Sequence, residues 1–72
     1  MIHRKIIGEN VRAARTQMKW SQEKLAARAK LSSDYISTLE RGLVNVSVDT
    51  LVKIAKAMSI RFAELVKNVD RT

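Results

Sequence analysis

Few side chains in this sequence could catalyse a reaction. The 72 residues include no cysteine and one histidine, His3, close to the N-terminus. A nucleophile or a metal site needs partner groups beside such a histidine, and the scattered acidic residues show no pair suited to acid–base chemistry. Two glycines cannot form a glycine-rich phosphate loop. The sequence therefore argues against an enzyme and indicates no cofactor, metal or small-molecule ligand.

Positively charged side chains outnumber the negatively charged ones in this sequence. Fourteen Lys and Arg against seven Asp and Glu give a net charge of +7. Residues 1–30 carry eight of the bases and two acids, whereas residues 31–72 carry six bases and five acids. A basic half of this kind indicates a surface that meets a polyanion, or simply a solvated face. Charge alone does not separate DNA from RNA or an anionic membrane surface.

Residues 21–42 form the segment around which the chain is organised, and they predict two short helices joined by a tight turn. Ser21 occupies an N-cap position, Ser32 or Ser33 can cap the second helix, and Gly42 suits a left-handed C-terminal cap. Small and apolar residues recur at helical spacing on one face of each helix: Leu25, Ala26 and Ala29, then Ile36 and Leu39. Such a pair predicts a helix-turn-helix unit whose second helix is shaped for a major groove.

The motifs Ser-Gln-Glu-x-Leu-Ala at 21–26 and Tyr-Ile-Ser-x-Leu-Glu-Arg-Gly at 35–42 resemble the phage-repressor/Cro-like (XRE) helix-turn-helix family. The likeness continues through Gly8 upstream and Ser47-Val48-x-x-Leu-x-x-Ile-Ala-x-Ala at 47–57 downstream. Within this family the chain is most similar to the controller proteins of restriction–modification systems. The resemblance implies an all-α fold, a compact five-helix lambda-repressor-like DNA-binding domain.

We expect one domain over residues 1–72, with a frayed tail from Val69. The expected helices span about 3–18, 22–29, 33–41, 48–58 and 61–68. Helical periodicity predicts the buried faces of the first and fourth helices: Ile7, Val11, Ala14 and Met18, then Leu51, Ile54, Ala55 and Met58. Gly8 predicts a close helix contact, and Lys30 is expected in a left-handed conformation because the family usually has glycine there.

The resemblance places base-contacting residues in the first two turns of the second helix of the motif: Ser33, Asp34, Tyr35, Ser37 and Thr38. Ser and Thr hydroxyls can donate to or accept from several bases, and a carboxylate accepts from cytosine N4. Asp34 has a second interpretation, as a first-turn residue that only complements the helix dipole. Tyr35 is expected to be exposed, opposite Ile36.

Phosphate-contacting candidates flank that helix: Gln22, Trp20, Arg41, Asn45, Lys24 and Arg28. Gln22 opens a helix whose free N–H groups suit an anion, and the family residue matching it commonly touches the DNA backbone. Trp20 can instead act as a hydrophobic staple, and Lys24 and Arg28 can simply be solvated. By resemblance, Arg15 and Glu40 form an internal ion pair rather than a DNA contact.

Family members usually bind palindromic DNA as two-fold dimers, so we expect a homodimer on double-stranded DNA. Candidate interface residues are the apolar ones of the last helix and the residues next to it, with two additions from the loop after Gly42: Ile60, Phe62, Leu65, Val66 and Val69, then Leu43 and Val44. The alternative is that they belong to the core. The chain is expected in the cytoplasm, associated with the nucleoid, because no membrane span or signal peptide is evident.

The sequence thus predicts a transcriptional regulator, an activator or a repressor, with RNA polymerase as a further candidate partner. Controller protein, phage repressor and antitoxin all fit this class. A protein-interaction module that docks a toxin or polymerase is the alternative function, and a basic membrane-surface peptide is a weaker one.

Overall fold

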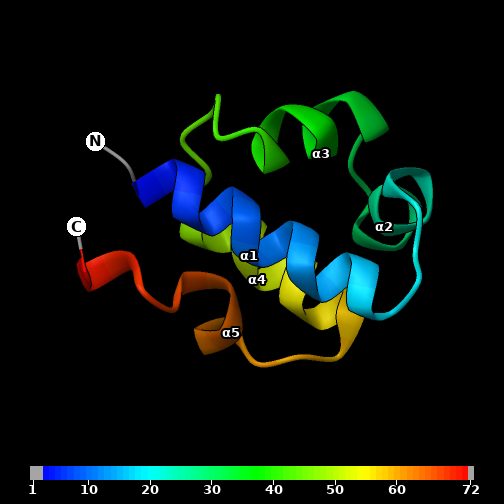
Figure 1. The fold of residues 1–72 in the computed structure, drawn as a ribbon. Coiled ribbons are helices and arrows are strands. Elements are labelled where there is room, and N and C mark those ends of the chain that lie inside the picture. Colours follow the sequence, from blue (N-terminus) through cyan, green and yellow to red (C-terminus); the bar gives the residue numbers. More distant parts are fainter. Residues whose placement is uncertain (1–2, 72) are drawn as a thin grey trace.

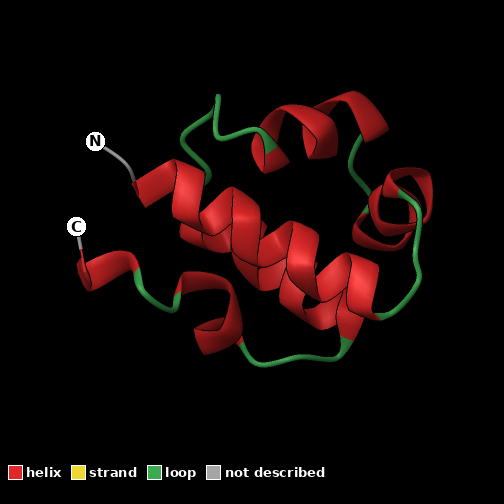
Figure 2. Ribbon diagram, in the orientation of Figure 1, coloured by secondary structure: helices red, strands yellow, loops and turns green. Residues whose placement is uncertain are grey.

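The computed structural model describes residues 3–71, and regular structure within them is helical (Figures 1 and 2). The elements are α1 (His3–Gln17), α2 (Gln22–Ala29), α3 (Ser33–Glu40), α4 (Val48–Met58), α5 (Phe62–Val66) and a 3₁₀ turn, η1 (Val69–Arg71). The predicted all-α, five-helix fold is confirmed. Residues 1, 2 and 72 of the predicted domain lie outside the described range.

The predicted and observed first residues agree for the helices that have a serine N-cap. Ser21 accepts the N–H of Lys24 at 3.0 Å and Ser47 accepts that of Thr50 at 3.1 Å, and both α2 and α4 begin where predicted. α1 and α3 each end one residue earlier than expected.

The end of the chain differs more from the prediction. Lys67 is extended and Asn68 is left-handed, so α5 is five residues long: it begins one residue later and ends two residues earlier than predicted. The expectation of a frayed tail from Val69 was wrong for residues 69–71, which turn as η1 and pack against α1.

The helices are arranged in a way that leaves α3 on one side of α1 and α5 on the other (Figure 1). α1 packs against both of these helices, and α2 packs against α3 and α4. The core between them includes Val11, Leu25, Ile36, Ile54 and Leu65, each with none of its surface exposed. The predicted inner face of α4 is confirmed, because all four of its residues are buried.

The predicted stripe of α1 was only partly right. Val11 is buried, and Ile7 and Ala14 are half-buried against the core. Met18 is 37% exposed, because α1 ends at Gln17 and Lys19 turns the chain away with a φ of 61°. The tight contact expected at Gly8 is confirmed: a Cβ there would overlap the carbonyl oxygen of Leu39 and lie 2.8 Å from that of Glu40.

Lys30, between α2 and α3, is left-handed as predicted, with a φ of 60° and a ψ of 45°. This conformation costs a non-glycine residue about 1–2 kcal/mol. We expect Lys30→Gly to leave the free energy of unfolding unchanged or to raise it by about 1 kcal/mol, since the relieved strain offsets the added entropy of the unfolded chain.

Urea denaturation of the wild type and of Lys30→Gly measures the change in the free energy of unfolding. Lys53→Gly is the matched control, because Lys53 is an exposed residue inside α4 and glycine there should cost about 1 kcal/mol. A loss as large in Lys30→Gly as in the control would contradict the left-handed assignment.

Candidate nucleic-acid interface

α3 is braced by α2 and capped at both ends. Ala26 and Ala29 of α2 are buried, and their small side chains allow α3 to approach closely. Ser32 accepts the N–H of Tyr35 at 3.0 Å. At the other end Gly42 has a φ of 76°, and the N–H groups of Gly42 and Leu43 donate to the carbonyls of Leu39 and Thr38. This is the hydrogen-bond pattern of a Schellman C-cap, so α3 is a short rod with defined ends.

The residues predicted to contact bases all keep accessible surface on α3. Asp34 is exposed, and Ser33, Tyr35, Ser37 and Thr38 are half-buried. The Asp34 carboxylate forms no ion pair or hydrogen bond within residues 3–71, which leaves it free to accept. The Thr38 hydroxyl donates to the Asp34 carbonyl at 2.8 Å, so its methyl group and oxygen lone pairs remain for a ligand.

Tyr35 is less exposed than predicted. It is half-buried and packs against the core, although helical phase placed it opposite Ile36. Because the ring is long, one part of it can pack against the fold while another part stays in solvent. Tyr35 therefore contributes to the position of α3 as well as to its outer surface.

The predicted ion pair between Arg15 and Glu40 is present and holds the end of α3 to α1. Arg15 Nε and Nη2 donate to the two carboxylate oxygens of Glu40 at 2.7 and 3.0 Å. The two residues are 9% and 8% exposed. Arg15 Nη1 also donates to the Trp20 carbonyl at 2.7 Å. Glu40 is thus enclosed within the fold, and its bonds to Arg15 fix the position of α3 relative to α1.

Gln22 joins this network, a link that sequence reasoning missed. Its Nε2 donates to Glu40 Oε1 at 3.0 Å, so the side-chain amide faces the ion pair. The first N–H groups of a helix have no intrahelical partner, and Ser21 accepts the N–H of Lys24 rather than those of Gln22 or Glu23. A phosphate at this end of α2 would therefore meet main-chain N–H groups.

The remaining phosphate candidates are accessible cations and one amide. Lys24, Arg28, Arg41 and Asn45 are exposed. Lys24 Nζ and Arg28 Cζ lie 5.1 and 5.6 Å from the centre of the Trp20 ring, within the range of a cation–π contact. Trp20 is half-buried against the core, in agreement with its structural interpretation, and holds the two cations on one surface.

Asn10 is a buried polar residue that sequence reasoning overlooked. Its Nδ2 donates to the carbonyls of Leu65 and Lys67 at 3.1 and 2.9 Å, and so satisfies the C-terminal end of α5. The available signal was its position on the buried side of α1, directly before Val11. The residue fastens α5 to α1.

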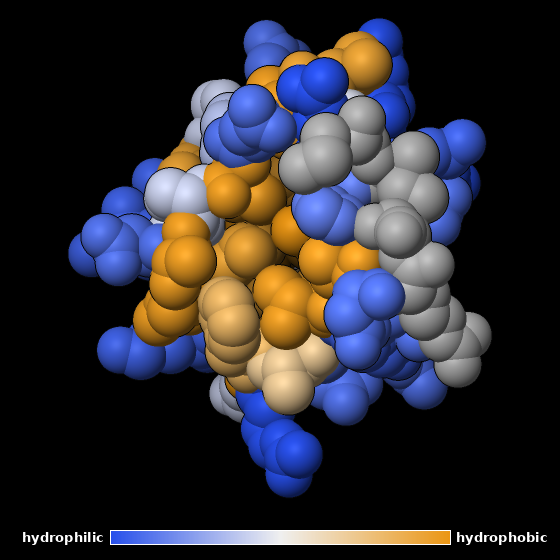
Figure 3. All heavy atoms as spheres, turned by 90° about the vertical axis from the view of Figure 1, so that its left-hand side faces the viewer, coloured by the Kyte–Doolittle hydropathy of each residue, from blue (hydrophilic) through white to orange (hydrophobic). Residues whose placement is uncertain are grey.

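One predicted interface residue belongs to the core. Leu65 has no exposed surface in the single chain, so it was wrongly placed among the interface residues. Ile60, Phe62, Val44 and Val66 are half-buried against the core, and Leu43 is 56% exposed. Hydrophobic residues gather on the face toward the chain termini (Figure 3), where the loop after α3 and the start of α4 also lie. Val48, at the start of α4, is 64% exposed.

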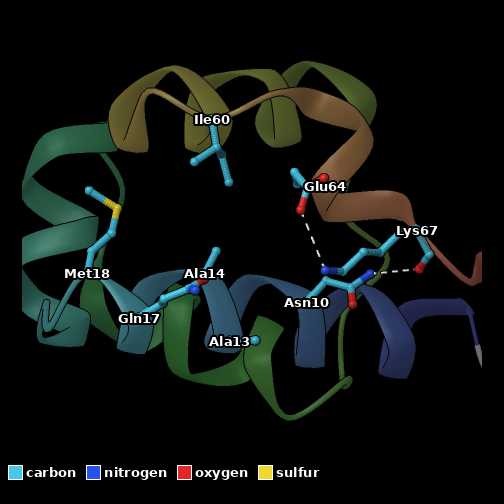
Figure 4. Close-up of a pocket in the computed structure, with 8 residues that line it drawn as sticks. All are labelled: Asn10, Ala13, Ala14, Gln17, Met18, Ile60, Glu64 and Lys67. Carbon is cyan, nitrogen blue, oxygen red and sulfur yellow. Dashed lines mark hydrogen bonds and ion pairs between the residues drawn. The ribbon is translucent and has the colours of Figure 1, made fainter.

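A pocket of about 180 Å³ lies between α1 and the region of α5 (Figure 4). Three of its polar lining residues interact with one another: Asn10 donates to the Lys67 carbonyl, and Glu64 pairs with Lys67 at 3.5 Å. These groups serve the packing of α5. Within residues 3–71, no three His, Asp or Glu side chains come together as a metal site would require, and no helix is long and apolar enough to cross a membrane.

Comparison with known proteins agrees with this geometry. A family profile described as helix-turn-helix matches residues 11–65. The chain is 39% identical to a transcriptional regulator of this type, y4dJ of Sinorhizobium fredii, over 96% of this chain and 90% of the relative. It is 43% identical to the control protein C.BamHI of Bacillus amyloliquefaciens, over 86% and 78% of the two chains.

A solved structure shows the same likeness in three dimensions. The restriction-modification controller protein C.AhdI of Aeromonas hydrophila superposes with a TM-score of 0.84 at 37% identity, over 86% of this chain and 90% of that one.

Proposed function

Because this chain belongs to the helix-turn-helix family of DNA-binding transcriptional regulators, we propose that it binds a palindromic operator as a homodimer and controls a restriction–modification operon. The observation that carries the proposal is α3 itself. It presents accessible polar side chains along one side, while its other side is fixed by buried residues and by the Glu40–Arg15 pair.

The reading surface is the outer side of α3. Ser33, Asp34, Tyr35, Ser37 and Thr38 face base edges, and hydroxyl and carboxylate groups of this kind discriminate bases in the major groove. Around it, the free N–H groups of α2 at Gln22, together with Trp20, Lys24, Arg28, Arg41 and Asn45, meet phosphates and fix the register.

The hydrophobic face in Figure 3 is the surface on which two copies meet. A single reading helix contacts too few bases for high specificity, and a two-fold dimer doubles the contacts. The exposed Leu43 and Val48 belong to the loop after α3 and the start of α4, which lie on that side of the molecule, and we take the half-buried Val44, Val66 and Val69 as further interface residues. Ile60 and Phe62 keep part of their surface and stay candidates, whereas Leu65 does not.

Regulation in this proposal acts through occupancy. The dimer covers or flanks a promoter in the cytoplasm, on nucleoid DNA, and blocks or recruits RNA polymerase. The similarity to the control protein C.BamHI and to the restriction-modification controller protein C.AhdI supports the assignment to restriction–modification control. Since dimerisation depends on concentration, expression of the controlled genes would follow the accumulation of this protein.

Selection of binding sites from random duplex DNA tests the function. We expect a two-fold symmetric site with half-sites about 34 Å apart, one turn of the duplex. Its affinity should fall steeply with salt, because each neutralised phosphate releases counterions. A scrambled duplex of the same length is the control. If it competes as well as the selected site, the proposal fails.

A further inference from the structure

The exposed cations of α1 have no role in the function proposed so far. Arg4, Lys5 and Arg12 are exposed, although they occupy three of the fifteen positions of a helix that also supplies the core. They come from the strongly basic first part of the chain. The placement of α1 against α3 decides what these side chains face.

Gly8 fixes the orientation of α1. Its Cα faces the carbonyls of Leu39 and Glu40, so this side of α1 is turned toward the end of α3. Residues three or four positions apart lie on one face of a helix. Arg4 and Arg12 are four residues before and after Gly8, and Lys5 is three before it. The three cations therefore border the contact between α1 and α3.

A second contact ties Lys5 to Gly42, just after the end of α3. A Cβ on Gly42 would lie 2.8 Å from the Cα of Lys5, so the main chains of the two segments touch. Arg41, which is also exposed, directly precedes Gly42. Arg4, Lys5, Arg12 and Arg41 are hereafter called the α1 basic ridge.

No acid among the described residues forms an ion pair with the α1 basic ridge. In residues 3–71 the ion pairs are Arg15–Glu40 and Glu64–Lys67. Glu40, at the end of α3, is buried and already paired with Arg15, and Glu9, the one acid of α1, is exposed and forms no ion pair with the described residues. Cations gathered without a counter-charge repel one another and attract a polyanion.

We propose that the α1 basic ridge contacts phosphates of the operator beside the end of α3, and that α1 thereby extends the DNA interface beyond the helix-turn-helix unit. This inference rests on the proposed function, because it places α3 in the major groove. Contacts of this kind carry no sequence information. They should strengthen binding to the selected and the scrambled duplex alike.

The test compares two double variants of the full chain. In Arg4→Ala/Arg12→Ala two ridge charges are removed, and in Lys53→Ala/Lys56→Ala two exposed charges are removed from α4, which packs on α2 and α5. Affinity for the selected and the scrambled duplex is measured across a series of salt concentrations. Thermal melting verifies that each variant is folded.

For the ridge variant we expect affinity to fall about tenfold at low salt on both duplexes. The slope of log K against log salt should shrink by about 0.9 for each phosphate that the variant no longer neutralises. Arg4→Lys/Arg12→Lys should retain most of the wild-type slope, because it keeps the charges. The α4 variant should change the slope much less.

Three results would overturn the inference. An unchanged slope in the ridge variant would exclude phosphate contacts at α1, and an equal fall in affinity in both alanine variants would reduce the effect to net charge. A fall confined to the selected duplex would indicate base reading instead. By contrast, a wild-type protein that binds neither duplex would overturn the proposed function as well.

Discussion

Replacing Glu40 with alanine is expected to lower the free energy of unfolding by about 3–5 kcal/mol. Arg15 is 9% exposed and donates two hydrogen bonds to Glu40. Without the carboxylate, the Trp20 carbonyl is the one hydrogen-bond partner that this buried guanidinium keeps among residues 3–71. The Gln22 amide loses its acceptor too. A small domain is stable by about 5–15 kcal/mol in total, so the change is a large fraction of the whole.

Urea denaturation followed by circular dichroism measures this destabilisation. Glu64→Ala is the matched control, because it breaks the other ion pair, whose partners are more than half exposed and whose expected contribution is about 0–1 kcal/mol. DNA affinity of Glu40→Ala should fall together with stability, since α3 loses its anchor to α1. Weaker DNA binding with an unchanged urea midpoint would show that Glu40 contacts DNA and would contradict its structural role.

Gly8→Ala is expected to destabilise the protein by about 2–3 kcal/mol, the cost of overpacking. The added methyl group would overlap the main-chain carbonyl of Leu39 and press on that of Glu40, neither of which can rotate away. α1 would have to move away from α3. The usual effect of this substitution inside a helix is a gain of about 1 kcal/mol, so the expected sign is the reverse of the usual one.

The reverse substitution on the exposed side of α1 is the control. Ala13 is exposed, and Ala13→Gly should cost about 1 kcal/mol through helix propensity alone. Both variants are compared by urea denaturation. If Gly8→Ala were as stable as the wild type or more so, then the close approach of α1 to α3 would be wrong. The placement of the α1 basic ridge depends on the same approach.

Together, the two predictions concern how α3 is held. The polar side chains on its outer side can act on DNA only if the helix keeps a fixed direction, and its direction depends on a close contact at Gly8 and an ion pair at Glu40. Both contacts come from α1. A change in α1 far from any base can therefore weaken DNA recognition through position alone.

Local sequence determined most of the helical framework. Ser21, Ser32 and Ser47 can each accept the N–H of a residue three positions on, so the starts of α2, α3 and α4 depend on neighbouring residues alone. The left-handed Gly42 likewise follows from short-range chemistry, whereas the left-handed Lys30 was expected from the family resemblance, because lysine itself does not favour a positive φ. The family resemblance added the Arg15–Glu40 pair, which no local pattern could specify because 25 residues separate the partners.

Tertiary structure decided the features that depend on packing between distant segments. Leu65 and Met18 are both apolar residues on helical stripes, yet they end in different surroundings. Leu65 lies in the core where Asn10 of α1 holds the end of α5, whereas Met18 is 37% exposed because α1 ends at Gln17 and Lys19 turns the chain away. The position of the α1 basic ridge also depends on packing between distant segments. Residue types alone identified its cations, but only the contact of Gly8 with the end of α3 shows which surface they border, since helical phase fixes relative and not absolute orientation.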